Sequence, residues 1–92
     1  MGKYLVEYTD TALKDLKKHK KTGEKSTLSK ISKLIIELEQ HPYTGTGKPE
    51  ELKHQLKGFW SRRINRTDRL VYSINDKTVT VEVISAMGHY SK

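Results

Sequence analysis

The chain has 92 residues with a formal net charge of +7 at pH 7, and 34% of its residues are hydrophobic. This length allows one domain over residues 1–92, the apolar pattern is too periodic for a disordered chain, and the absence of cysteine excludes disulfides and thiol chemistry. The positive charge favours a polyanionic partner, with nucleic acid ahead of an anionic membrane or an acidic protein.

The N-terminal half of the chain is predicted to form one strand and two helices. Aromatic and β-branched residues alternate with other residues over residues 3–8, which is typical of a strand. Thr9 or Asp10 can cap the short helix that follows, and Gly23 can end it. A second helix is predicted from about Ser26 to Gln40, because apolar residues recur there at helical spacing: Leu28, Ile31, Leu34, Ile35 and Leu38.

The C-terminal half is predicted to form three antiparallel strands. His41 and Pro42 end the second helix, since the residue before proline avoids the α region, and a glycine-containing loop covers residues 43–49. Strands are expected at roughly 57–65, 68–75 and 78–87, with a tight turn at residues 75–77. The pattern predicts an α+β fold in which two N-terminal helices pack on a four-stranded, mainly antiparallel sheet. The side chains expected to face the helices are Trp60, Ile64, Leu70, Tyr72 and Ile74.

The opposite face of these strands carries two arginines, Arg63 and Arg69. If residues 65–67 form a three-residue loop, the two stand directly opposite each other, whereas a two- or four-residue loop would separate them. Directly opposed like charges cost up to about 1 kcal/mol, so their pairing suggests that an anion belongs between them. Alternatively, each guanidinium is solvated or pairs with a carboxylate such as Glu82.

An imidazole and a phenol, those of His89 and Tyr90, follow the last predicted strand directly. A terminal segment frays unless it is tied down, so this pair is better placed to contact a ligand than to fill a core. Tyr90 can donate a hydrogen bond or stack on a nucleic-acid base.

The sequence contains the types of side chain that are needed to cleave RNA by attack of its own 2′-hydroxyl. The reaction needs a base for that hydroxyl, cations for the developing dianionic phosphate and an acid for the leaving 5′-oxygen. Glu50 or Glu51 can be the base and His89 the acid, since an imidazole titrates near neutrality. Taken singly, each such residue is more often a solvated surface group. The candidate cations are Lys53, Arg63 and Arg69.

Membrane insertion and metal binding are not expected. No apolar run approaches the ~18 residues of a membrane span, and no hydrophobic stretch follows Lys3 as a signal peptide requires. We therefore expect a cytoplasmic protein. Without cysteine, four scattered histidines are the only soft metal ligands, so neither a metal nor another cofactor is expected.

Four segments resemble the YoeB (Txe) branch of the RelE toxin superfamily. They are residues 45–54 (GTGKPEELKH), residues 56–64 (LKGFWSRRI), residues 68–72 (DRLVY) and the closing pair His89 and Tyr90. The N-terminal half agrees with that family in its order, a strand followed by two helices. The resemblance implies a RelE-like fold similar to microbial ribonucleases, and a toxin that cleaves messenger RNA in the ribosomal A site.

The resemblance also implies a role for each site residue. Glu50 matches the family's general base, Arg69 its phosphate-stabilising arginine, and His89 with Tyr90 its terminal catalytic pair. The remaining basic positions are then expected to bind the RNA or its phosphate: Lys48, Lys53, Arg62 and Arg63.

Partners follow from the same resemblance. The implied partners are mRNA on the ribosome, the surrounding rRNA, and a cognate antitoxin of the YefM or Axe type, while homodimer formation stays open. Many members of the family end at the tyrosine, whereas Ser91 and Lys92 extend this chain. Two alternatives are a gyrase-directed toxin of the ParE branch, whose members lack this base and His-Tyr pair, and a plain RNA-binding module.

Overall fold

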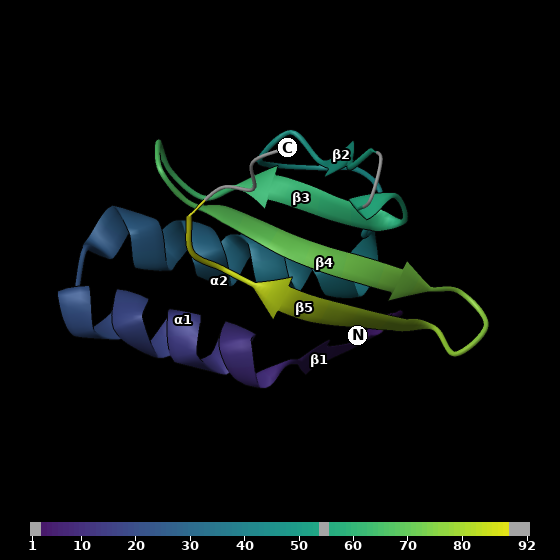
Figure 1. Cartoon of the computed structure of the whole chain (residues 1–92), viewed down its shortest axis with the longest axis horizontal. Coiled ribbons are helices and arrows are strands. Elements are labelled where there is room, and N and C mark those ends of the chain that lie inside the picture. The colour runs from purple at the N-terminus through teal and green to yellow at the C-terminus, as the bar shows by residue number, and fades with distance from the viewer. Residues whose placement is uncertain (1–2, 54–55, 89–92) are drawn as a thin grey trace.

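The computed structural model describes residues 3–53 and 56–88 and has two helices and a five-stranded sheet (Figure 1). The helices are α1 (Asp10–Thr22) and α2 (Lys25–Gln40). The strands are β1 (Leu5–Tyr8), β2 (Glu50–Glu51), β3 (Phe59–Arg63), β4 (Arg69–Asn75) and β5 (Thr80–Ser85).

The strands lie in the order β1-β5-β4-β3-β2, with β1 parallel to β5 and the other neighbours antiparallel. This confirms the α+β fold and the mainly antiparallel sheet. The sheet has five strands instead of the predicted four, because β2 pairs with the edge of β3. Two residues are too few to show an alternating pattern, so β2 could not be recognised in the sequence.

Local signals determine where α1 begins and ends. The Thr9 hydroxyl accepts a hydrogen bond from the Ala12 N–H at 3.0 Å, which satisfies one of the free N–H groups of the first turn. Gly23 adopts a left-handed conformation with φ of 74°, and its N–H returns to the His19 carbonyl. Both predicted ends of this helix are confirmed.

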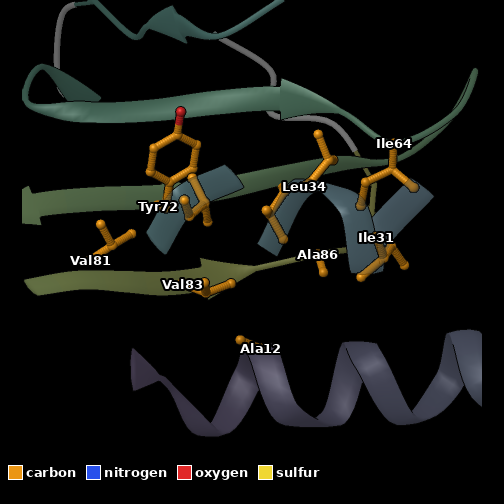
Figure 2. Close-up of a cluster of buried hydrophobic side chains, with 10 residues drawn as sticks. Ala12, Ile31, Leu34, Ile64, Tyr72, Val81, Val83 and Ala86 are labelled. Atoms are coloured by element: carbon orange, nitrogen blue, oxygen red, sulfur yellow. The ribbon is translucent and has the colours of Figure 1, made fainter. Parts of the chain in front are cut away.

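The core lies between one face of the sheet and the two helices. Figure 2 shows Tyr72 on β4 and Val81 and Val83 on β5, with Ala12 of α1 and Leu34 of α2 among the side chains that pack with them. All five residues are fully buried. Trp60 and Ile74 pack at the margin of this core, as their strand alternation predicts. Within the described residues, no helix is both long and apolar enough to span a membrane.

Candidate active site

The two arginines on the open face of the sheet stand directly opposite each other. Arg63 of β3 pairs with Arg69 of β4 in the strand register. The loop between them closes through a hydrogen bond from the Ile64 N–H to the Asp68 carbonyl at 3.0 Å, which leaves residues 65–67 as the three-residue connection. Asn65 stabilises that loop because its side-chain oxygen accepts bonds from the following backbone N–H groups. The predicted pairing is confirmed.

Strand β2 brings Glu50 to the same face of the sheet. Glu50 pairs with Ser61, which precedes Arg63 by two residues on β3. Directly paired residues share a face, and residues two apart on one strand also do, so Glu50 and both arginines lie on the face away from the helices. Glu51 pairs with Trp60 and therefore lies on the other face. The strand register thus favours Glu50 over Glu51 as the candidate base.

The carboxylate considered as a partner for these arginines is remote from them. Glu82 pairs with Ser73, which is four residues from Arg69 along β4, or about 13 Å at roughly 3.3 Å per residue. Among residues 3–53 and 56–88, the one ion pair joins Arg62 to Glu37. Arg63 is exposed and Arg69 is half-buried, so their charges remain available to an anion on the open face.

The two candidate lysines flank Glu50 and are exposed. Lys48 has a positive φ of 53°, and it follows Gly47, whose carbonyl accepts a 2.7 Å hydrogen bond from the Arg63 N–H. The backbone beside Lys48 is therefore attached to β3 at the level of Arg63. Lys53 follows β2 directly after Leu52, whose N–H donates to the Phe59 carbonyl at 2.8 Å.

Arg62 does not belong to this surface, and its predicted RNA contact is wrong. Its side chain is fully buried and forms a salt bridge with Glu37 at 2.7 Å. The guanidinium also donates to the Tyr72 hydroxyl and to three backbone carbonyls, so all five N–H donors are engaged within the protein. The carbonyls belong to His41, Thr44 and Thr46.

The burial of Arg62 had a signal in the sequence. Arg62 lies midway between Trp60 and Ile64, both predicted to face the helices, so strand alternation places it on that face too. A guanidinium group is well suited to bind phosphate, but Arg62 lies on the side of β3 that faces the helices, where RNA cannot reach it. The buried partner could not be foreseen, because Glu37 lies 25 residues earlier on α2.

The Arg62–Glu37 pair attaches the loop after α2 to the sheet. Partial burial raises the pKa of Glu37, but hydrogen bonds from Thr46 and the charge and hydrogen bond of Arg62 lower it more, so the net shift is downward. A side chain at Gly45 would collide with the Glu37 carboxylate, which explains a glycine there. The loop that leads to Lys48 and Glu50 is therefore held by a buried ion pair.

His89 and Tyr90 lie outside the described residues, but the chain that leads to them is located. The Gly88 carbonyl accepts a 2.8 Å hydrogen bond from the Arg69 N–H, and the Gly88 N–H donates to the Asp68 carboxylate at 2.8 Å. Gly88, the residue before His89, is thus hydrogen-bonded to the backbone of Arg69, a candidate phosphate ligand.

Two buried polar residues of α1, which the sequence patterns did not predict to have a role, also contact this segment. Asp15 accepts a hydrogen bond from the Ala86 N–H at 2.9 Å, and His19 donates from Nε2 to the Ala86 carbonyl at 2.7 Å. Their spacing of four residues places them on one face of the helix, which was the available signal.

Comparison with known proteins identifies the family. A family model for the YoeB-like toxins of bacterial type II toxin–antitoxin systems matches residues 8–90. The chain belongs to this family. Toxin YoeB of Escherichia coli K12 is 47% identical over 58 residues, which cover 63% of this chain and 69% of that protein. Toxin YoeB of Synechocystis is 45% identical over 70 residues, or 76% of this chain and 79% of that protein.

Solved structures of YoeB-like toxins have the same fold over nearly the whole chain. A YoeB/ParE toxin from Agrobacterium tumefaciens has a TM-score of 0.86 and 34% identity, covering 94% of this chain and 99% of its own. The YoeB of a Staphylococcus aureus dimer has a TM-score of 0.80 and 32% identity, and the match covers 96% of this chain and 99% of that YoeB chain. A chain of the YoeB–YefM complex from the same organism has a TM-score of 0.78 and 33% identity, and the match covers 95% of this chain and 98% of that one.

In this YoeB-like toxin, the open face of the sheet combines a carboxylate with two opposed guanidinium groups. The carboxylate of Glu50 can accept a proton, while Arg63 and Arg69 can bind the two oxygens of a phosphate with forked hydrogen bonds. Such a face is suited to a phosphodiester whose neighbouring hydroxyl must lose a proton.

Proposed function

We propose that this YoeB-like toxin is an endoribonuclease that cleaves messenger RNA in the ribosomal A site and so inhibits translation. The observation that carries the proposal is the direct pairing of Arg63 with Arg69 on the sheet face that also holds Glu50. Two opposed cations with a nearby base suit a scissile phosphate better than they suit a purely structural sheet, because opposed like charges destabilise strand pairing.

In the proposed reaction, side chains of this protein carry the proton transfers and bind the phosphate, while the ribosome aligns the message. Glu50 takes the proton of the 2′-hydroxyl as its oxygen attacks phosphorus, and the bond from phosphorus to the 5′-oxygen breaks. His89 donates a proton to that leaving oxygen, which leaves a 2′,3′-cyclic phosphate and a free 5′-hydroxyl. Proton transfer by a positioned group contributes on the order of 10² to 10⁴ in rate. Arg63 and Arg69 stabilise the charge that develops on the phosphate oxygens, and Tyr90 supports the leaving group or stacks on a base.

The basic composition supports the proposed partners. A net charge of +7 favours mRNA and rRNA on a cytoplasmic ribosome, and it also favours an acidic antitoxin of the YefM type. Relatives from Staphylococcus aureus have been solved as a YoeB–YefM complex and as a YoeB dimer. We include both assemblies in the proposal for this chain, with the antitoxin tail folding on the toxin as it binds.

Expression in bacteria tests the proposed residues. Glu50→Ala, Arg69→Ala and His89→Ala should each relieve growth arrest, because each removes one element of the reaction while the core stays intact. Circular dichroism should confirm that the variants are folded, and Glu51→Ala is the matched control that should remain toxic. Undiminished toxicity of all three folded variants would contradict the assignment. Intact messages with accumulated gyrase–DNA cleavage complexes would indicate a ParE-like toxin instead.

A further inference from the structure

Two side chains of α1 hold the backbone just after β5. Asp15 accepts a hydrogen bond from the Ala86 N–H, and His19 donates one to the Ala86 carbonyl. Side chains of one helix therefore bind both backbone polar groups of Ala86. Asp15 is 8% exposed, His19 is 5% exposed and Ala86 is fully buried. Buried polar side chains are costly unless they are hydrogen-bonded, and here the bonds go to a segment that no longer has a strand partner.

The β3–β4 connection holds the next part of the same segment. Asp68 accepts the Gly88 N–H and the Arg69 N–H donates to the Gly88 carbonyl, each at 2.8 Å. Gly88 has φ of 66°, a left-handed conformation that turns the chain there. Partial burial raises the pKa of Asp68, but hydrogen bonds from Gly88, Asn65 and Thr67 bring the net pKa below its ordinary value. The carboxylate is therefore ionised as an acceptor at neutral pH.

All four backbone polar groups of Ala86 and Gly88 are thus bonded to residues distant in sequence. A segment after the last strand usually frays unless side chains or other backbone groups tie it down. The bonds converge on residues 86–88, and the proposed acid and its tyrosine neighbour follow directly at positions 89 and 90. One of the bonded groups is the backbone of Arg69, the proposed phosphate ligand.

We propose that Asp15, His19 and Asp68 form a clamp that fixes residues 86–88 beside Arg69, and that RNA cleavage by the adjoining His89 and Tyr90 depends on this clamp. The inference rests on the proposed function, and it makes these three positioning residues rather than groups that touch RNA. Asp68 offers the cleanest test because it is only half-buried, so its removal leaves the core of the domain intact.

The test compares Asp68→Ala with Asp68→Asn in cleavage of a translated message. Displacing a catalytic group by about 1 Å can cost about 10²-fold, so Asp68→Ala should lower kcat by about 10- to 100-fold with little change in KM. Asp68→Asn keeps an oxygen that can accept the Gly88 N–H and should restore most of the activity. Thr67→Val removes a hydroxyl that bonds to Asp68 but not the Gly88 contact, and it should cleave like the wild type. A wild-type kcat for folded Asp68→Ala would overturn the clamp.

A double-mutant comparison separates the clamp from general destabilisation. If Asp68 acts through the terminal pair, Asp68→Ala should cause little further loss in a His89→Ala background when residual cleavage is followed over long incubations. An equal loss in both backgrounds would overturn the inference while leaving the proposed function intact. Full activity of His89→Ala alone would instead overturn the proposed role of His89, and the clamp with it.

His19 provides an independent arm of the same test. His19→Gln keeps an N–H that can reach the Ala86 carbonyl, whereas His19→Leu fills the space without a donor. We expect His19→Gln to retain the kcat that His19→Leu loses, provided that both unfold at similar urea concentrations. Equal kcat for the two folded variants would contradict a positioning role for His19.

Discussion

At the scale of single residues, two neighbouring arginines on β3 have opposite environments. Arg62 is fully buried and ion-paired with Glu37, whereas Arg63 is exposed on the open face beside Arg69. The difference follows from strand geometry, because successive side chains point to opposite faces of a sheet. The two identical side chains therefore have different roles: Arg62 attaches a loop to the sheet, and Arg63 provides a positive charge on the surface.

This contrast predicts a large difference in stability between matched variants. Arg62→Met should lower the free energy of unfolding by about 3 to 5 kcal/mol, because it leaves the Glu37 carboxylate unpaired in a largely buried site. Arg63→Met should change it by no more than about 1 kcal/mol, and in the stabilising direction, because it removes the repulsion between the opposed arginines at an exposed position. Urea denaturation of both variants measures the difference. Equal losses would show that Arg62 does not anchor the loop.

At the scale of elements, three segments meet at Asp76 in the β4–β5 turn. The Asp76 carboxylate accepts hydrogen bonds from the hydroxyls of Tyr4, just before β1, and Tyr43, in the loop after α2. Tyr43 also packs edge-on against Trp60, with ring centroids 5.4 Å apart. The hydrogen bond to Asp76, together with desolvation and the carboxylate charge, raises the pKa of Tyr43 to about 12.

Removing this carboxylate charge should change the alkaline titration of the protein. A raised folded-state pKa contributes stability that is fully present below the ordinary value of 10.0 and is lost as the pH rises through about 12. Asp76→Asn should move the pKa of Tyr43 back toward 10.0, with tyrosinate absorbance appearing at lower pH. Titration of Tyr43→Phe is the control that identifies this residue. Superimposable curves for the wild type and Asp76→Asn would refute the coupling.

The helices and strands also show which features of the fold could be predicted from the sequence. The helices and the last three strands are local, so hydrophobic periodicity and capping residues were sufficient to locate them. The opposed arginines could be predicted only conditionally, because their pairing depends on the length of one loop. The contacts of Asp15 and His19 with Ala86 span 71 and 67 residues, and no local pattern carries such information.

At the scale of the whole molecule, the fold separates a helical side from an open sheet face. The helices bury the apolar face of the sheet, and the other face carries Glu50, Arg63 and Arg69 from three adjacent strands. The end of the described chain returns to the same region, where Gly88 is bonded to Arg69. Residues far apart in the sequence thus converge on one surface, which is the surface that the proposed function assigns to the RNA phosphate.

Cleavage of a translated message is the most direct test of the proposed ribonuclease activity. Primer extension should show discrete cuts within codons when the wild-type toxin is added to a translating extract, and much weaker cleavage of the same RNA without ribosomes. Glu51→Gln should retain these cuts, whereas Glu50→Gln should reduce their rate by on the order of 10²-fold or more, because it cannot accept the 2′-hydroxyl proton. Equal cutting by the two variants, or no cleavage by the wild type in either setting, would contradict the proposed activity.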